Sequence, residues 1–430
     1  MTHEAAGVTD ARHGRVVVTG VGAVSPLGIG RQETFGNLVA GASGIDRITR
    51  FDPTRHQVRI AGEVKDFDPL NYMDRKLARR LGRYAHFAIA TAAEAAAHAR
   101  LDLSAEDPAR VATVVGCAAG DFPLLEEQMS QYMACGPGRV HPLTVPRVSS
   151  SMAAANIAMH YGLTGPSFGT ASACATGAHA VACAWLLLRA GCADVAFAGG
   201  TEAPITPTFI EGYTSLGALS RRNSEPARAS RPFDRDRDGF VIAEGSAVLV
   251  LETLEHARRR GAPILAELTG VGMACEAYHL TASEPSGRAA GRAIRAALDT
   301  AGLRVGDVDY VNAHGTGTAF NDAAETGAIK AALGDHAYRT PVSSIKSMVG
   351  HCIGAAGALE AFTCVMALTE GVIPPTINLD APSPECDLDY VPHVARRCSP
   401  RVAVSNSFAF GGQICVLVFE RANGLVSAGT

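Results

Sequence analysis

Residues 168–177 read FGTASACATG, a short extended segment that runs into a helix of small and apolar residues. Residues 342–357, VSSIKSMVGHCIGAAG, follow the same plan in the second half of the chain. We expect the two helices to begin at Cys174 and His351. Both are apolar on most of their faces, which predicts burial between sheets. A buried pair of equivalent helices whose N-termini face one cleft is a candidate functional site.

Other segments of the two halves match in the same order. The stretch 16–22, VVVTGVG, is expected to be a buried strand that ends in a turn. The matched pairs are 16–22 with 264–272, 111–120 with 308–317, 168–177 with 342–357, and 245–252 with 411–420. Such matches predict an internal duplication with its joint near residues 255–263, and hence two halves, 1–260 and 261–430. The alternation of strands and helices predicts an α/β layered fold.

Composition excludes several classes of function. The 430 residues include 38 basic and 42 acidic side chains, so the chain has no overall positive field for nucleic acid. The longest apolar run, Ala180–Leu188, is too short to span a bilayer, and the polar segment Met1–Arg15 does not resemble a signal peptide. The 11 cysteines form no C-x-x-C pair. We therefore expect a soluble, cytoplasmic protein with reduced thiols.

Cys174 lies where the extended segment turns into the helix. A thiol at a helix N-terminus is expected to favour the thiolate, because the helix end stabilises negative charge. Its neighbours Ala173 and Ala175 are small and leave room for a substrate carbonyl. An isolated cysteine is more often a core residue, and the other ten cysteines keep that interpretation.

Candidate partners of this thiol lie in the second half. His314 stands in NAHGTGT at the end of an apolar strand, and Lys346 stands five residues before His351. Asp322 and Glu325 follow His314 and could pair with it or with Lys346. Each residue alone is as easily structural as catalytic, or, for the lysine, a solvated surface group. The combination is far more specific than any member.

Nearly the whole chain, from about Arg15 to Glu420, resembles the elongating β-ketoacyl-ACP synthases of the thiolase fold. The motifs that carry the resemblance are TASACATG (170–177), RPFDRDRDGFVIAEG (231–245), NAHGTGT (312–318), SSIKSMVGH (343–351) with IGAAG (353–357), and NSFAFGG (406–412). The resemblance implies a duplicated α/β/α/β/α layered fold. It also implies decarboxylative condensation of acyl thioesters with malonyl-ACP, and neither a cofactor nor a metal.

The resemblance assigns roles to individual residues. Cys174 is implied to carry the growing acyl chain, while His314 and His351 assist decarboxylation and stabilise the enolate. Lys346, paired with Glu325, is implied to order the site. The backbone N–H groups of Cys174 and Phe410 are implied to form an oxyanion hole, and Phe408 belongs to the same gate. These roles agree with the chemistry, because acyl transfer needs aimed N–H donors and enolate formation suits neutral imidazoles.

Two motifs mimic other sites. Asp234, Asp236 and Asp238 begin like a calcium loop, but the twelfth position is Gly245 where calcium loops carry glutamate. Gly20-x-Gly22 follows a strand as in dinucleotide sites, but no third glycine stands at the required place. We discount both interpretations.

A basic cluster suggests the partner. A helix is expected over 72–99, and its first turns carry basic residues at i, i+4 spacing. The cluster could be an ordinary solvated face, but the family places a carrier-protein patch here, so we expect docking of an acidic acyl carrier protein. The docking residues are Arg75, Lys76, Arg79 and Arg80, with Arg139 as a weaker candidate.

Several stretches favour a polyketide pathway over fatty-acid synthesis. GTGTAFND, SSIKSMVGH and SPECDLDYVP are similar to the ketosynthase subunit of bacterial type II polyketide synthases, which often pairs with a chain-length factor. Ala409 replaces a glycine of the usual NSFGFGGTN and stiffens the loop that would move Phe410. The NSFAFGG ending fits aromatic-polyketide subunits less well, which leaves a polyene-type or other unusual product open. Small residues at the expected acyl pocket, Ala119 and Thr144, predict longer or stiffer chains. The alternative is a homodimeric 3-oxoacyl-ACP synthase II.

Two further hypotheses are weaker. A non-catalytic partner subunit would not need Cys174 together with two histidines. A thiolase that acts on CoA esters needs a second active-site cysteine, and the candidate, Cys415, lies in the strand beyond Gly412.

Overall fold

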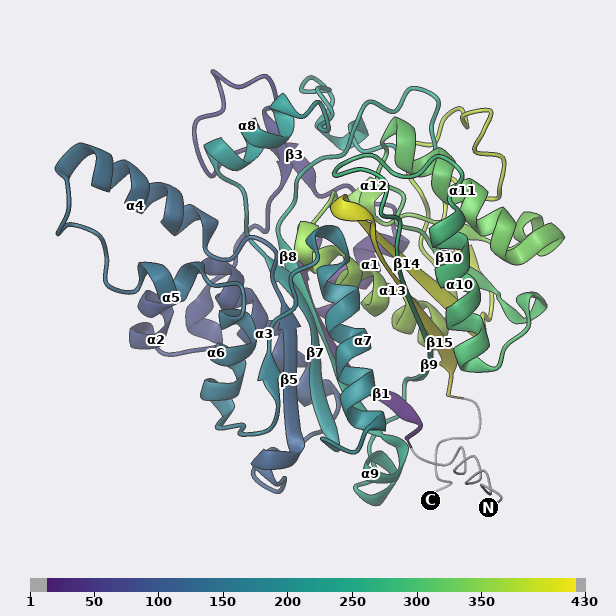
Figure 1. The fold of residues 1–430 in the computed structure, drawn as a ribbon, viewed down its shortest axis with the longest axis horizontal. Coiled ribbons are helices and arrows are strands. Elements are labelled where there is room, and N and C mark those ends of the chain that lie inside the picture. The colour runs from purple at the N-terminus through teal and green to yellow at the C-terminus, as the bar shows by residue number, and fades with distance from the viewer. Residues whose placement is uncertain (1–13, 423–430) are drawn as a thin grey trace, which may run out of the picture.

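The computed structural model describes residues 14–422, so most of the polar segment Met1–Arg15 lies outside the described residues. The main sheet has the strand order β11-β10-β14-β15-β9-β1-β8-β7-β5-β6 (Figure 1). Its strands in the first half are β1 (Val16–Ser25), β5 (Val111–Gly116), β6 (Ser167–Phe168), β7 (Val195–Glu202) and β8 (Gly245–Thr253). Those in the second half are β9 (Ala266–Cys275), β10 (Tyr310–Asn312), β11 (Val342–Ser343), β14 (Val402–Ala409) and β15 (Gln413–Arg421).

The strand order of one half repeats in the other. In the first half β6, β5 and β7 are parallel neighbours, and β8 and β1 follow antiparallel. In the second half β11, β10 and β14 are parallel neighbours, and β15 and β9 follow antiparallel. The two half-sheets meet where β1 pairs with β9 over Val16 to Val18. The exact joint expected at residues 260 and 261 stays a prediction.

Five short strands, thirteen α-helices and eight short 3-10 helices complete the described residues 14–422. The short strands are β2 (Gly28–Ile29), β3 (Ile45–Arg47), β4 (Ile60–Gly62), β12 (Val372–Ile373) and β13 (Arg396–Arg397). The helices are α1 (Arg31–Val39), α2 (Arg75–Arg80), α3 (Arg83–His98), α4 (Phe122–Cys135), α5 (Thr144–Val148), α6 (Met152–Tyr161), α7 (Thr176–Arg189), α8 (Pro207–Ser215), α9 (Leu254–Arg259), α10 (Arg288–Ala301), α11 (Ala319–Leu333), α12 (Lys346–Val349) and α13 (Ala356–Glu370).

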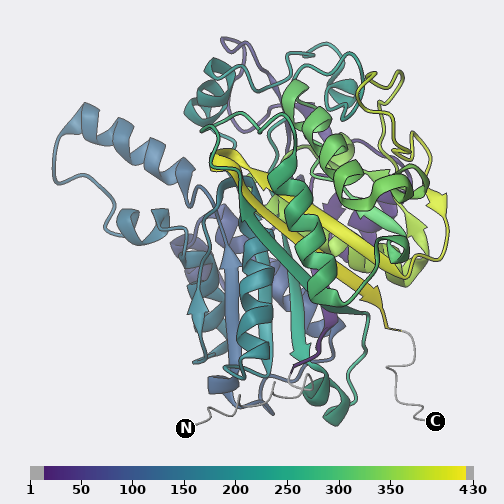
Figure 2. The ribbon, with the colours of Figure 1, turned by 45° about the vertical axis from the view of Figure 1, so that its right-hand side comes forward.

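The helices form layers around the two half-sheets. Helices α7 and α13 lie between them and contact strands of both halves, α3 and α6 cover the outer face of the first half, and α10 covers that of the second (Figures 1 and 2). The segment Ile353–Glu370, which includes α13, is apolar and long enough to cross a membrane, but 89% of it is buried inside the protein. It is therefore a core helix, placed where burial satisfies its apolar surface.

Two expectations about local structure are wrong. The stretch 16–22 does not end in a turn, because β1 continues to Ser25. Gly22 lies inside the strand, where a Cβ would stand 2.1 Å from the carbonyl oxygen of Thr91 in α3. The matching Gly272 of β9 would meet the oxygen of Ala293 in α10 at 2.0 Å. These glycines let a helix pack closely on its strand.

The single helix expected over 72–99 is also wrong. Helix α2 ends at Arg80, and α3 begins at Arg83. Leu81 and Gly82 between them are extended, and a Cβ at Gly82 would lie 2.3 Å from a carboxylate oxygen of Asp121. The close approach of Asp121 thus explains why the chain breaks its helix at a glycine.

Candidate active site

Cys174 and His351 stand on two matching turns. Cys174 belongs to the 3-10 turn η3 (Ala173–Ala175) before α7, and His351 lies two residues before the turn η7 (Ile353–Ala355) that precedes α13. The expectation that His351 itself begins the helix is therefore wrong, since its backbone N–H and C=O pair with Val241 and Ala243. Ala173 and Ile353 have φ of +47° and +43°, a strained conformation that is found mostly at functional sites.

Close helix packing brings the two turns together. A Cβ at Gly177 in α7 would lie 2.7 Å from the backbone nitrogen of Ala358 in α13. A Cβ at Gly357 in α13 would lie 2.7 Å from the backbone nitrogen of Ala178 in α7. The reciprocal contact places the start of each helix against the other, so the segments just before them face one space.

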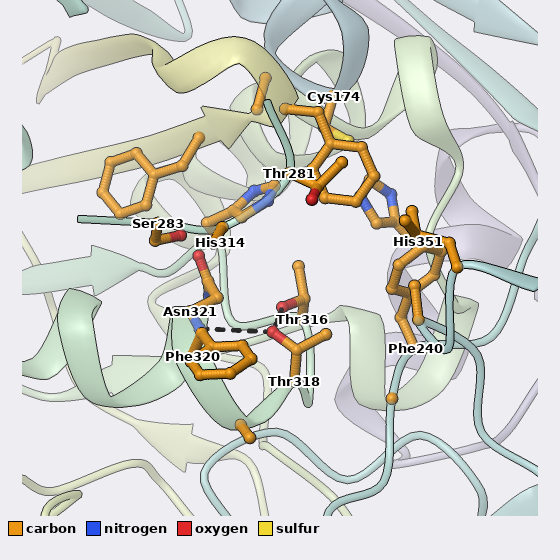
Figure 3. Close-up of a pocket in the computed structure, with 18 of the residues that line it drawn as sticks. Cys174, Phe240, Thr281, Ser283, His314, Thr316, Thr318, Phe320, Asn321 and His351 are labelled. Atoms are coloured by element: carbon orange, nitrogen blue, oxygen red, sulfur yellow. Dashed lines mark hydrogen bonds between the residues drawn. The ribbon is translucent and has the colours of Figure 1, made fainter. Parts of the chain in front are cut away.

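That space is a cavity of about 300 Å³. Figure 3 shows Cys174, His314 and His351 around it, with the imidazole rings turned toward the cavity. The two ring centroids are 5.6 Å apart and the planes are nearly perpendicular, at 83°. Phe240 and Phe408 pack against the rings of His351 and His314, at 5.0 and 5.7 Å between centroids. The structure thus brings together the thiol and both histidines that the sequence singled out.

Hydrogen bonds fix the tautomer of each imidazole. Nδ1 of His351 accepts the backbone N–H of Ile353 at 3.1 Å. Nδ1 of His314 lies 3.3 Å from Nζ of Lys346, and an ammonium group can only donate. In each neutral ring the proton is therefore on Nε2. Burial lowers the pKa of both histidines well below its usual value, and the nearby Lys346 lowers it further, so the rings stay neutral. The site holds two N–H donors.

Lys346 pairs with a carboxylate that the sequence analysis did not single out. Its Nζ donates to the carbonyl oxygen of His314 at 2.6 Å and forms an ion pair with Glu360. The expected pairing of Lys346 with Glu325 is therefore wrong. Glu360 also accepts the hydroxyl of Ser407 at 3.0 Å. A lone acid in the apolar helix sequence AGALEAFTCVMAL (356–368) was the available signal, because a buried carboxylate needs a partner.

Glu325 and Asp322 do not pair with Lys346 but accept hydrogen bonds from backbone N–H groups. Glu325 accepts the N–H groups of His314 and Gly315 at 2.8 and 2.7 Å, and burial raises its pKa to about 7. Asp322 accepts the N–H groups of Phe233 and Gly317 at 2.7 and 3.1 Å. Both carboxylates are buried. They fix the loop that carries His314, since several backbone donors converge on each.

The thiol of Cys174 is buried, and burial raises its pKa to about 12. Lys346 and a hydrogen bond from the backbone N–H of Phe410 oppose this shift in pKa. The expected stabilisation of a thiolate by the helix N-terminus therefore does not prevail, because desolvation of the charge costs more. The resting group is a neutral thiol.

The loop after β14 closes the cavity beside Cys174. Phe410 is half-buried, and its ring stacks on Tyr213 with 6.2 Å between centroids. Gly411 donates to the carbonyl oxygen of Leu280 at 2.7 Å, and Glu276 donates to that of Gly412 at 2.8 Å. Ala409 is extended, with φ −143° and ψ 156°, so its methyl group causes no strain in this conformation.

Other predicted residues lie apart from this cavity. Ala119 and Thr144 do not line it: Ala119 follows β5, and Thr144 begins α5 on an arm that α4 and α5 form outside the body (Figures 1 and 2). The docking candidates Arg75, Lys76, Arg79, Arg80 and Arg139 are all exposed. Their roles stay predictions.

The apparent calcium loop has another use. The carboxylate of Asp234 accepts a hydrogen bond from the guanidinium of Arg231 at 2.9 Å. It also accepts hydrogen bonds from three backbone N–H groups, those of Asp236, Asp380 and Ala381, at 2.8, 2.9 and 2.9 Å. These bonds tie the segment 231–238 to the loop near residue 380. Asp234 is thus a structural residue.

Comparisons with known proteins identify the family of the chain. The sequence models "Beta-ketoacyl synthase, N-terminal domain" and "Beta-ketoacyl synthase, C-terminal domain" match residues 13–257 and 265–380. A protein of Synechocystis named 3-oxoacyl-[acyl-carrier-protein] synthase 2 is 47% identical over 95% of this chain and 98% of its own length.

Solved structures show the same fold. The ishigamide ketosynthase/chain length factor has a TM-score of 0.90 and 36% identity, over 95% of this chain and 99% of that one. A type II PKS acyl-carrier protein in complex with its ketosynthase bound to the hexaketide gives a TM-score of 0.88 and 34% identity, over 95% of this chain and 100% of that one. The expected thiolase-like α/β fold is confirmed by these likenesses.

Proposed function

Because the chain belongs to the β-ketoacyl synthase family, we propose that Cys174 carries the acyl chain and that His314 and His351 drive the decarboxylation of malonyl-ACP. The observation that carries this assignment is the cavity in which one thiol faces two Nε2–H donors. A neutral thiol and two neutral donors suit a reaction that passes through an oxyanion and an enolate.

In the first step the sulfur of Cys174 attacks the carbonyl carbon of an acyl-carrier thioester. The tetrahedral oxyanion is stabilised by the backbone N–H groups of Cys174 and Phe410, and the latter lowers the pKa of the thiol. Collapse breaks the carbon–sulfur bond to the carrier. The proton of Cys174 leaves on the carrier thiol, so that the products are acyl-Cys174 and free carrier.

In the second step malonyl-ACP loses carbon dioxide, and the electron pair of the broken carbon–carbon bond forms an enolate. The enolate oxygen accepts hydrogen bonds from Nε2–H of His314 and of His351. The enolate carbon then attacks the carbonyl of acyl-Cys174, and collapse releases 3-oxoacyl-ACP and the Cys174 thiolate, which takes up a proton. Lys346 contributes its positive charge and holds the carbonyl oxygen of His314.

The stoichiometry tests the reaction. Purified protein is incubated with an acyl-ACP and malonyl-ACP labelled at the free carboxylate. One carbon dioxide should be released for each 3-oxoacyl-ACP formed. Product formed with the label retained would contradict decarboxylative condensation.

For the pathway we propose a ketosynthase subunit of a type II polyketide synthase. The likeness to a solved ketosynthase of a type II PKS and to the ishigamide ketosynthase/chain length factor supports it. The alternative, a homodimeric enzyme of fatty-acid synthesis, is favoured by the 47% identity to 3-oxoacyl-[acyl-carrier-protein] synthase 2. An acyl carrier protein is the partner in both cases, and we expect a cytoplasmic location for both.

We further propose that the protein works as a dimer that uses the side with α4, α5, α6 and β6. Strand β6 ends the main sheet. Exposed apolar side chains gather on these elements, namely Met129, Tyr132, Met133, Val145, Met159 and Phe168. A large apolar surface of this kind is typical of an interaction site.

Expression alone, and together with a homologue that lacks the nucleophilic cysteine, separates the two pathways. A chain that is active alone as a homodimer on saturated acyl-ACP supports fatty-acid synthesis. Activity that requires a homologue without the nucleophilic cysteine supports the polyketide assignment.

A further inference from the structure

Glu202, the last residue of β7, is a fully buried carboxylate that neither the sequence analysis nor the proposed mechanism uses. Its oxygen Oε2 accepts the backbone N–H groups of Ala118 and Gly354 at 2.8 and 3.0 Å. Its oxygen Oε1 accepts the thiol of Cys117 at 3.1 Å and the N–H of Ala119 at 3.2 Å. All four partners are donors, and none of them carries a positive charge. A buried carboxylate without a cation is costly, so its four bonds need an explanation.

One of these bonds reaches the turn that orients His351. Ile353 and Gly354 are consecutive residues of η7. The N–H of Ile353 donates to Nδ1 of His351, and the next N–H, of Gly354, donates to Glu202. The turn is strained at Ile353, with φ +43°. Strained backbone persists only where the surroundings hold it.

The strand beneath is shaped for this contact. Glu202 follows the sequence AGGT (198–201), and a Cβ at Gly200 would lie 2.6 Å from the carbonyl oxygen of Gly354. The glycine lets η7 rest directly on β7. The strand end can then place a carboxylate under the N–H of Gly354.

We propose that Glu202 is a positioning residue for His351: its carboxylate holds the turn Ile353–Gly354, so that Nδ1 stays an acceptor and Nε2–H points into the cavity. The inference rests on the proposed role of His351 as a donor to the enolate. Glu202 is absent from the lining of the cavity that holds Cys174, His314 and His351. It acts through the turn, and through the segment 117–119 on its other side.

The ionisation of Glu202 predicts how the rate of decarboxylation should depend on pH. Burial raises its pKa to about 7, and the bonds from Cys117, Ala118, Ala119 and Gly354 oppose the shift in pKa. Protonation adds a donor where all four neighbours are donors, so at least one bond breaks. As pH falls through about 7, the turn should loosen and decarboxylation should slow.

Other titratable groups face the same region. Tyr84, Cys174, Tyr213 and Cys352 feel the charge of Glu202, and burial raises the pKa of each. All four stay neutral near pH 7. Glu325, whose pKa is also raised to about 7, titrates in the same range, so the test has to separate the two carboxylates.

The test compares Glu202→Gln with Glu63→Gln. Glu63 is a matched control, because it is also buried and accepts the backbone N–H groups of Thr49 and Arg50 at 2.9 and 3.0 Å. In Glu202→Gln we expect carbon dioxide release from malonyl-ACP to fall roughly 10- to 100-fold, the cost of a misplaced group, while acylation of Cys174 changes less than about twofold. Glu63→Gln should change neither rate.

The pH profile of carbon dioxide release provides a second readout. In Glu202→Gln, the decrease in carbon dioxide release near pH 7 that protonation of Glu202 causes should disappear. If that variant does not fold, Cys117→Ala replaces it: loss of one donor raises the pKa of Glu202, so the acid limb should move to higher pH with acylation unchanged. The proposal would be overturned if folded Glu202→Gln lost acylation and decarboxylation equally. It would also be overturned if either variant kept the rate and the pH profile of carbon dioxide release of the wild-type protein.

Failure of the proposed function is recognised separately. If His351→Ala decarboxylates normally, the role of His351 itself is wrong, whatever the Glu202 variants do.

Discussion

The two turns that build the site have the same backbone plan but are held by different means. Turn η3 carries Cys174 and turn η7 follows His351, and each has a strained residue before a buried central helix. The strand β14 of the second half reaches over to η3, and β7 of the first half reaches over to η7. Each half therefore completes the turn of the other.

The difference lies at the strand ends. At the end of β14 a loop with Gly411 and Gly412, both at positive φ, brings the N–H of Phe410 to Cys174. At the end of β7 the buried carboxylate of Glu202 binds the N–H of Gly354. The turn that carries Cys174 is thus closed by a glycine-containing loop, whereas the turn that follows His351 is bound by a buried carboxylate. Under the proposed function, the difference corresponds to two tasks, because acyl exchange at Cys174 needs a mobile loop and alignment of His351 needs a fixed turn.

The largest expected effect separates the two turns by function. His314→Ala and His351→Ala should each slow carbon dioxide release from malonyl-ACP by about 10²- to 10⁴-fold, because each removes a donor to the enolate. Both variants should still form acyl-Cys174. The exposed His393→Ala is the control. Near-normal carbon dioxide release by either variant would show that the histidine has been misassigned.

A second prediction concerns the charge that supports the histidine side. Lys346→Met leaves Glu360 buried without its cation, which should cost about 3–5 kcal/mol in the free energy of unfolding. Lys330→Met is the matched control, since its pair with Asp387 is partly exposed and should be worth less than about 1 kcal/mol. Denaturant unfolding measures both. Similar losses for the two variants would contradict the importance given to the buried pair.

Charge reversal in the basic cluster should have a smaller effect, and this effect should be similar for the reactions at the two turns. Charge reversal of Arg79 and Arg80 to Glu should raise KM for acyl-ACP and for malonyl-ACP, roughly tenfold at low salt, and spare small acyl mimics. The exposed pair Arg258 and Arg259 on α9, reversed in the same way, is the control. Unchanged carrier kinetics at low salt would rule the cluster out.

The smallest effect is expected at the loop beside Cys174. Ala409→Gly should add mobility worth roughly 0.5–1 kcal/mol, and so change the rate of acyl exchange only a few-fold. Decarboxylation should change less, because His351 is held from β7. Stopped-flow acylation compared with carbon dioxide release measures the two. A larger effect on decarboxylation would contradict the difference between the turns.

The sequence predicted the layered fold and the meeting of Cys174, His314 and His351, because each stands in a motif at a strand or helix end. It did not predict the partner of Lys346. Glu325 is near His314 in sequence, but Glu360 reaches Lys346 through the packing of α13, and no local pattern shows such a contact. Glu202 was missed for the same reason, since all four of its partners lie more than 80 residues away in the sequence.

The break between α2 and α3 shows a different limit. The residues from 72 to 99 have a continuous helical pattern, and a single glycine within a helix is tolerated. The break follows from the position of Asp121, a tertiary contact that the periodicity of one segment cannot reveal.

The central claim is that the acyl chain is carried by Cys174 and by no other cysteine. Peptide mapping by mass spectrometry, after incubation of wild-type protein and Cys174→Ala with acyl-ACP, tests it most directly. Wild-type protein should carry one acyl group, on the peptide that contains Cys174. Cys174→Ala should carry none on the ten remaining cysteines and form no 3-oxoacyl-ACP. An acyl adduct on another cysteine, together with retained condensation activity in Cys174→Ala, would contradict the account.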